Sequence, residues 1–255
     1  MVTKLLSVIV FMLLTACVSH KNVALSPCAS LSSLDAIPEG IQTCRKAYSV
    51  GHNADTGRIA WVHYRLTTDS SVVSPSIYPL DVDAAESPSR HLPVEFDWAQ
   101  LVPSNLNAYD RQAFEESRES LIAIPMHKHL HRYMEFYGDW AVTSRWEASY
   151  GIRKPDTDVF SGPIYENGDV IPSHFYKVYY DRKTPAMMAM IFENNGEIDD
   201  AHLAHNVVTV DCVEERTGLN FFAGVPDEND LENDNAITVR YWNMIDGNSR
   251  RYGCK

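Results

Sequence analysis

Alternating and periodic runs of hydrophobic residues divide the chain into short strands and helices. Residues 61–66 and 175–180 alternate or are rich in β-branched and aromatic residues, which indicates two strands. The apolar run 187–192 predicts a buried strand opposite the second of these. Residues 111–121 and 130–150 are predicted to form helices, the second with apolar side chains at roughly helical spacing. The pattern is typical of a mixed α and β fold.

Composition and charge narrow the picture further. A chain of 255 residues with 45% hydrophobic and 22% charged residues is ordinary for one globular domain with a filled core. The formal net charge is -12. Binding to a phosphate backbone needs clustered Lys and Arg, so this acidic balance disfavours a strong general affinity for nucleic acid. A local basic groove stays open, although the densest basic stretch, residues 127–132, is modest.

The amino terminus indicates the compartment. Lys4 precedes an apolar run, residues 5–14, that is shorter than an ordinary membrane-spanning helix. Residues 14–17 (LTAC) resemble a bacterial lipobox, which predicts a mature chain that begins at a lipidated Cys17. The alternative is a cleaved secretory signal followed by an incidental cysteine.

This amino terminus predicts a domain division and a location. Residues 1–16 would be a lipoprotein signal peptide, residues 17–43 a lipidated tether, and residues 44–255 the folded domain. No Asp follows Cys17, which predicts the outer membrane, with the protein facing the periplasm. The expected partners are envelope proteins and, through the lipid, the membrane itself.

Four cysteines remain after Cys17, an even number for an oxidising compartment, and they predict disulfides. Cys28 with Cys44 would close the segment before the first strand. Cys212 with Cys254 would attach the carboxy-terminal tail to the late part of the core. Four cysteines allow three connectivities, so the pairing stays open at this point.

A series of motifs from about Cys44 to about Asn235 resembles the DNA/RNA non-specific endonuclease family, and the motifs come in the family's order. They are residues 58–67 (RIAWVHYRLT), 97–104 (DWAQLVPS), 107–117 (NAYDRQAFEES), 161–165 (SGPIY), 171–178 (IPSHFYKV) and 213–222 (VEERTGLNFF). The resemblance implies an α+β fold of the ββα-metal (His-Me finger) type, with a central antiparallel sheet flanked by helices. Secreted bacterial members of this family also suggest the pairing of Cys212 with Cys254.

The resemblance places altered residues at the family's catalytic motif. The frame Asp-Arg-Gly-His-Leu-Ala-Pro matches residues 97–103, and Asp97 is kept. The His that acts as general base falls on Gln100, and the Arg that holds the scissile phosphate falls on Trp98. A neutral amide can orient a water but cannot take its proton near pH 7.

The family's metal-site positions are altered as well. The metal-binding Asn of the pattern Asn-x-Gly-x-Trp falls on Phe136, which offers no oxygen to a hard cation. The Asn of the Ser-Asn-x-x-Pro-Gln turn falls on Ile122. The acidic residue that follows the Trp falls on Ser144, although a slip in this helix would bring Glu147 or Glu135 into play. Structural residues persist around these positions: Asp97, Leu101, Pro103, Pro125, Trp140 and the pair Gly162-Pro163.

Histidines offer other candidate chemistry. His127, His129 and His131 alternate, so on a strand they would share a face and could take zinc or copper, whereas on a helix only the first and last align. A solvated or partner-facing patch is the alternative. His91 could replace the lost base, but its place upstream of the motif strand disfavours that geometry. His205, like His202, is expected on a loop surface.

Residues 226–235 alternate acidic side chains as a calcium loop does. They lack the Gly and the spacing of an EF-hand, so we expect a solvated charged loop. The following residues, 237–254, are predicted to add a strand and a tail.

Three functions follow from the sequence. The first is a catalytically degenerate nuclease-fold lipoprotein that serves as a binding or structural subunit at the outer membrane, for example in a secretion or transport assembly. The second is a divergent metal-dependent DNA/RNA endonuclease, in which Mg²⁺ would be the cofactor; the other two functions require none. The third is a nucleic-acid binder without hydrolysis. The joint alteration of the family's base, phosphate-binding and metal positions favours the first.

Overall fold

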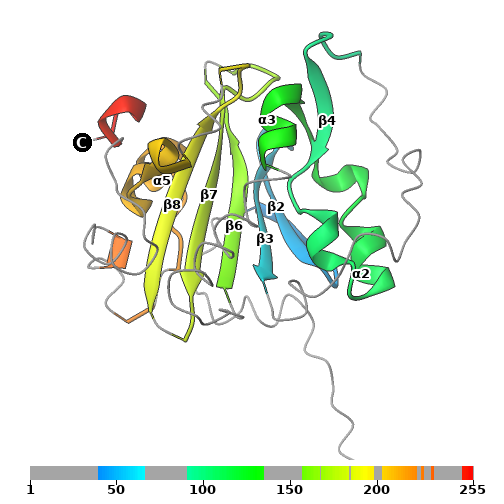
Figure 1. Ribbon diagram of the computed structural model, residues 1–255, viewed down its shortest axis with the longest axis horizontal. Coiled ribbons are helices and arrows are strands. Elements are labelled where there is room, and N and C mark those ends of the chain that lie inside the picture. Colours follow the sequence, from blue (N-terminus) through cyan, green and yellow to red (C-terminus); the bar gives the residue numbers. More distant parts are fainter. Residues whose placement is uncertain are drawn as a thin grey trace, which may run out of the picture.

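The computed structural model describes residues 40–66, 91–134, 157–166, 168–183, 185–197, 203–222, 225–226, 231–232 and 249–254. Its centre is a seven-stranded antiparallel sheet in the order β1-β2-β3-β6-β7-β8-β9 (Figure 1). The strands are β1 (Gly40–Cys44), β2 (Tyr48–Asn53), β3 (Ile59–Leu66), β6 (Thr157–Ile164), β7 (His174–Asp181), β8 (Ala186–Glu193) and β9 (Val207–Val208).

A second, two-stranded sheet covers one face of the first. It pairs β4 (Phe96–Gln100) with β5 (Ala123–His127), and α3 (Lys128–Tyr133) follows directly, so the three elements form a ββα unit. The connection from β4 to β5 contains η4 (Ser104–Asn107), α2 (Arg111–Glu116) and η5 (Ser120–Ile122). The α+β fold with a central antiparallel sheet is therefore confirmed.

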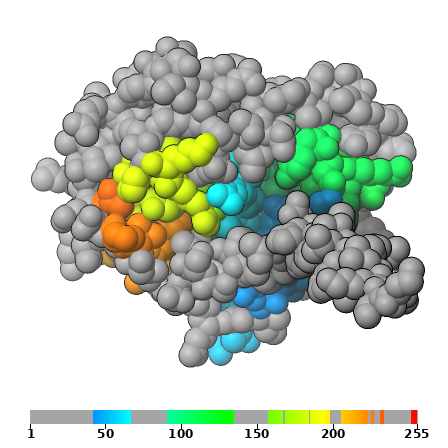
Figure 2. All heavy atoms as spheres, turned by 90° about the horizontal axis from the view of Figure 1, so that it is seen from below, coloured from blue at the N-terminus to red at the C-terminus, as the bar shows by residue number. Residues whose placement is uncertain are grey.

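The opposite face of the large sheet carries α5. Figure 1 shows α5 (Val210–Thr217) on one side of the sheet and α2, α3 and β4 on the other. Two short 3-10 helices complete the described chain, η7 (Leu203–Asn206) before β9 and η8 (Ser249–Tyr252) near the carboxy terminus. Figure 2 shows the molecule from below. The segment of β4 and β5, in green, and the described residues that follow α5, in orange, lie at opposite ends of this view.

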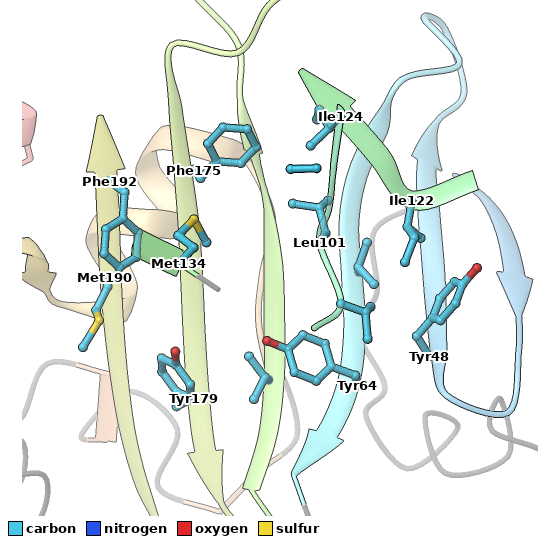
Figure 3. Packing of buried hydrophobic residues seen from close by; sticks show 14 of the residues in the cluster. Tyr48, Tyr64, Leu101, Ile122, Ile124, Met134, Phe175, Tyr179, Met190 and Phe192 are labelled. Atoms are coloured by element: carbon cyan, nitrogen blue, oxygen red, sulfur yellow. The ribbon is translucent and has the colours of Figure 1, made fainter. Parts of the chain in front are cut away.

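Both faces of the large sheet are buried, which explains the nearly continuous apolar runs of its central strands. Side chains of β7 alternate between two cores. Phe175 and Tyr179 enter the first core, between the sheet and the ββα unit, and Tyr176 and Val178 enter the second, beneath α5. Figure 3 shows Leu101 and Ile124 of the ββα side among the side chains that strands β3 and β7 direct to the first core.

Gly162 explains part of the Gly-Pro motif in β6. The hydroxyl of Tyr176 passes over this glycine and donates to the carbonyl of Ala60 at 3.0 Å. A Cβ on Gly162 would lie 2.5 Å from that hydroxyl and 2.6 Å from that carbonyl oxygen. Only glycine leaves room for the side chain of Tyr176 to cross β6 this closely.

One amide side chain connects the ββα unit to the large sheet. Asn194, buried just after β8, accepts a hydrogen bond from the backbone N–H of His127 at 2.7 Å. Its amide nitrogen donates to the carbonyls of Pro172 at 2.8 Å and Pro125 at 3.3 Å. Three segments that are distant in sequence therefore meet at this residue.

The predicted strands at residues 61–66, 175–180 and 187–192 are confirmed by β3, β7 and β8. The last two pair along their whole length, from His174 opposite Glu193 to Asp181 opposite Ala186. Their apolar, β-branched and aromatic composition fits a sheet that is covered on both faces.

The predicted helix at residues 111–121 is wrong in its second half. α2 ends at Glu116, because the hydroxyl of Ser117 donates to the carbonyl of Phe114 and the backbone of Glu119 is extended. The predicted helix at 130–150 begins earlier, at Lys128, since the side chain of His127 caps it. The continuation of that helix beyond residue 134 lies outside the described residues.

The first strand and the disulfides bear on the two ends of the predicted domain. β1 begins at Gly40, before residue 44, the predicted start of the folded domain. The predicted disulfide between Cys212 and Cys254 is present, with the two Cα atoms 5.3 Å apart. Cys44 is also disulfide-bonded, and its predicted partner Cys28 lies outside the described residues, as does Cys17. Of residues 237–254, which were predicted to add a strand and a tail, the structure describes only 249–254, and these contain η8.

Across the described part of the chain, no helix is both long and apolar enough to cross a lipid bilayer.

Candidate functional site

A cavity of about 50 Å³ lies beside Gln100, where β4 ends. The backbone there is held in place because the N–H of Leu101 donates to the carbonyl of Ile122 at 3.2 Å. The cavity brings together the end of the motif strand, α3 and the floor of the large sheet. It is lined by Gln100, Leu101, Val102, Pro103, Ser104, Met126, His131, Met134 and Lys177.

Lys177 supplies a buried positive charge at this cavity. It lies on β7, faces the first core and is only 1% exposed. Its ammonium donates to the hydroxyl of Tyr64 at 2.8 Å and lies 5.5 Å from the centre of that ring. Tyr64 directs its hydroxyl from β3 toward the neighbouring strands (Figure 3). The sequence motif around Lys177 indicated a strand but gave no sign that this residue would reach the candidate site.

The described lining of the cavity lacks the charged ligands that a divalent metal ion prefers. Mg²⁺ prefers carboxylates, carbonyls and water as ligands. The cavity lining, as far as the chain is described, contains no Asp or Glu but does contain the ammonium of Lys177.

The three alternating histidines do not form one site, because the chain changes from strand to helix between them. His127 ends β5 and accepts from the backbone N–H of His129 at 3.3 Å, and the two rings lie 5.3 Å apart. His129 also contacts the carbonyl of Gly196. His131 instead lines the cavity beside Gln100. The sequence hypothesis treated the segment as one strand or one helix, and neither applies.

The other positions of the vestigial motif have separate environments. Ile122 is fully buried in the first core, so the family's amide position is filled by apolar packing. Trp98 is half-buried opposite Pro125 and is not among the residues that line the cavity. Asp97 is exposed, and its carboxylate lies 3.8 Å from the ammonium of Lys128. Phe136 and Ser144 lie outside the described residues, as does Trp140.

The remaining described candidates do not line the cavity. His91 is exposed and is not part of its lining. His205 is exposed in η7, as expected for a surface residue, and borders a second cavity that includes Arg251. His202 lies outside the described residues.

The expectation of a solvated loop at residues 226–235 is wrong for at least one residue. Glu232 is only 6% exposed. Its carboxylate oxygens approach those of Asp211 and Glu214 on α5, with the three ligand atoms within 4.8 Å of one another. The sequence distance between α5 and residue 232 concealed this contact.

A buried network on the other face of the sheet was missed because its members are far apart in sequence. Asp158 on β6 is fully buried, and its carboxylate lies 2.9 Å from the ring of His63 and also contacts Arg182. Burial alone would raise the pKa of Asp158, but the hydrogen bonds and charges of its two basic partners outweigh burial and lower it. The network stabilises the sheet and takes no part in the cavity.

The cavity can bind through hydrogen bonds and charge, but it lacks the family's base at its usual place. Gln100 offers an amide and Ser104 a hydroxyl, while His131 and Lys177 offer ring nitrogens and an ammonium. An amide neither accepts a proton near neutral pH nor carries charge. His131 is an imidazole in the same cavity, although it comes from the helix and not from the motif strand.

The sequence and the fold both resemble those of known proteins. A sequence model described as DNA/RNA non-specific endonuclease matches residues 138–228. The nuclease of Serratia marcescens is 27% identical over 213 residues, which cover 74% of this chain and 77% of that protein. A chain in the crystal structure of the EndoG/EndoGI complex, solved for the mechanism of EndoG inhibition, shares the fold with a TM-score of 0.61 and 16% identity, over 79% of this chain and 94% of that one. The ordered motifs, the ββα unit and these likenesses together make the chain similar to the DNA/RNA non-specific endonuclease family.

Proposed function

We propose that this protein is a nuclease-fold binding protein of the bacterial envelope that does not hydrolyse phosphodiesters. One observation carries the proposal: the side chain at the base position, Gln100, borders a cavity whose described lining has a buried ammonium and no carboxylate. General-base catalysis contributes roughly 10²- to 10⁴-fold to rate, and a neutral amide forfeits it.

The proposed place of action is the periplasmic face of the outer membrane. The lipobox at residues 14–17 supports a lipid anchor on Cys17. The disulfides of Cys44 and Cys212 fit an oxidising compartment. An anchored chain with net charge -12 suits a role as a binding or structural subunit among envelope proteins, as in a secretion or transport assembly.

The catalytic part of the proposal is tested with the chain from Val18 onward, produced with its disulfides. Plasmid DNA and RNA are incubated with this protein and Mg²⁺, Mn²⁺ or Zn²⁺. We expect no cleavage above that of a preparation carrying Gln100→Ala. Cleavage by the wild-type protein that Gln100→Ala or His91→Ala abolishes would show that the cleft still works as a hydrolase.

The envelope part is tested in cells. The full chain and a Cys17→Ala variant are expressed with radiolabelled palmitate, and membranes are separated. Label and outer-membrane fractionation are expected for the full chain alone. Unlabelled full chain in the soluble periplasm would refute the anchor, and copurification from solubilised membranes identifies partners.

A divergent endonuclease is the second candidate, because His131 places an imidazole in the same cavity as Gln100. In that case the base would come from α3 and not from β4. Cleavage that survives Gln100→Ala but is lost in His131→Ala supports this candidate.

A further inference from the structure

A turn directly after β8 contains an Asn-Gly pair. Asn195 is half-buried, and Gly196 and Glu197 after it are exposed. The side-chain oxygen Oδ1 of Asn195 accepts a hydrogen bond from the backbone N–H of Glu197 at 3.0 Å. A bond of this kind folds the side-chain amide back toward the main chain of the next residue. The turn therefore directs the carbon Cγ of Asn195 toward the peptide nitrogen of Gly196.

Gly196 leaves this nitrogen open to the neighbouring amide. It has no Cβ, and among the described residues its N–H has no hydrogen-bond partner. The place also favours glycine, because a Cβ on Gly196 would lie only 3.1 Å from the ring carbon Cε1 of His127. Packing against this imidazole thus suits the one residue whose peptide nitrogen is the least hindered.

A carboxylate holds the other end of the same amide. The nitrogen Nδ2 of Asn195 donates to Oε2 of Glu193 at 2.8 Å. The other oxygen of Glu193 accepts a hydrogen bond from Arg251 at 2.8 Å, which fixes the carboxylate. These contacts polarise the amide for nucleophilic attack on Cγ. The N–H of Glu197 stabilises negative charge that develops on Oδ1, and the carboxylate of Glu193 stabilises positive charge on the departing Nδ2.

We propose that Asn195 is a site of spontaneous modification, at which water converts the side-chain amide to a carboxylate. The backbone nitrogen of Gly196 bonds to Cγ of Asn195, the bond from Cγ to Nδ2 breaks, and Nδ2 leaves as ammonia with the proton of the Gly196 N–H. Because both groups belong to one turn, this attack is intramolecular. Water then opens the succinimide ring at either of its carbonyls, which gives aspartate or isoaspartate. The conversion does not depend on what the cleft binds.

The conversion changes the contacts of this turn. A carboxylate at position 195 no longer donates to Glu193 and places a like charge beside it. Isoaspartate also lengthens the main chain directly after Asn194, whose amide joins the ββα unit to the large sheet. We therefore expect the modified protein to unfold at a lower urea concentration than freshly prepared protein.

The test is peptide mapping by mass spectrometry of the disulfide-intact chain from Val18 onward, before and after prolonged incubation in mildly alkaline buffer. Peptides must be separated, since Asn167 also precedes a glycine and lies outside the described residues. Fragmentation is expected to place the change at Asn195 and not at Asn194 in the same peptide. Asn194 is the internal control, because it is buried, its side chain is hydrogen-bonded and no glycine follows it. An unchanged Asn195, or equal conversion of Asn194, overturns the site.

Two variants test the chemistry. Gly196→Ala places a Cβ beside the attacking nitrogen and is expected to slow the conversion; conversion at the wild-type rate would exclude attack by this nitrogen. Because that Cβ also crowds His127, Asn195→Gln is the second variant. It keeps a neutral amide but requires a larger ring to close, so conversion at position 195 is expected to be lost.

The variants also test the effect on stability. Circular dichroism first verifies that both are folded. After the same incubation, the urea midpoint is expected to fall in the wild-type chain and to fall less in Asn195→Gln. An equal fall in both proteins would show that the conversion at Asn195 does not weaken the contact between the ββα unit and the sheet.

Discussion

Replacing Ile122 with the family's asparagine is expected to destabilise the protein strongly. Ile122 is fully buried in the first core. Removing its side chain forfeits about 1.5–3 kcal/mol of apolar burial, and an amide without partners at the same place costs about 1–3 kcal/mol more. The sum, about 2.5–6 kcal/mol, is comparable with the roughly 5–15 kcal/mol stability of an ordinary domain.

The measurement is urea unfolding of the disulfide-intact protein, followed by circular dichroism. Ile122→Val is the conservative control, with an expected loss of about 0.5–1.5 kcal/mol. Ser120→Asn, at an exposed position in the same 3-10 helix, should change the free energy of unfolding by no more than about 0.5 kcal/mol. If Ile122→Asn lost less than about 1 kcal/mol at an unchanged denaturant slope, the site would accept a polar group, and the reasoning that core packing has replaced the family's amide would be refuted.

Three further predictions concern stability. Replacing both Cys212 and Cys254 with Ala opens a loop closed across a sequence separation of 42, which corresponds to about 4 kcal/mol of chain entropy, and urea midpoints should fall accordingly. The pKa of Asp158 is lower in the folded state than its value near 3.9 in the unfolded chain. The ionised carboxylate therefore stabilises the fold fully above about pH 3.9, and this stabilisation is lost as the pH falls through the pKa of the folded state. The free energy of unfolding should therefore fall more steeply below about pH 4, and Asp158→Asn should make this fall less steep. The same pH dependence in the variant would contradict the pairing of Asp158 with His63 and Arg182. Asp110→Ala removes the N-cap hydrogen bond from the N–H of Ala113 at 3.0 Å, and thermal unfolding should show a free energy of unfolding lower by about 1 kcal/mol. An unchanged free energy would show that this cap does not stabilise the protein.

The sequence predicted the large sheet well, because burial on both faces leaves a strong local signal. Residues 187–192 are continuously apolar, and β8 is buried from Ala186 to Phe192. The family motifs around Trp61 and Gly162 lie in β3 and β6. Helix ends were less predictable, since a single hydroxyl, that of Ser117, ends α2 where the apolar pattern continues.

The candidate site was only partly predictable. Gln100 was found from the motif. The place of His131 in the same cavity depends on where β5 ends and α3 begins, and this boundary is set by the side chain of His127, which caps α3. Lys177 was visible in the sequence only as a strand residue. Its contact with Tyr64 joins residues 113 positions apart, and no local spacing encodes such a pair.

The amide of Asn194 has a consequence for how the cleft responds to its surroundings. Neutral hydrogen bonds to backbone groups at His127, Pro125 and Pro172 hold the ββα unit against the sheet here, and neither ionic strength nor mild acidity weakens such bonds directly. A joint built from uncharged groups keeps the shape of the cleft constant while the charges around it are screened or titrated.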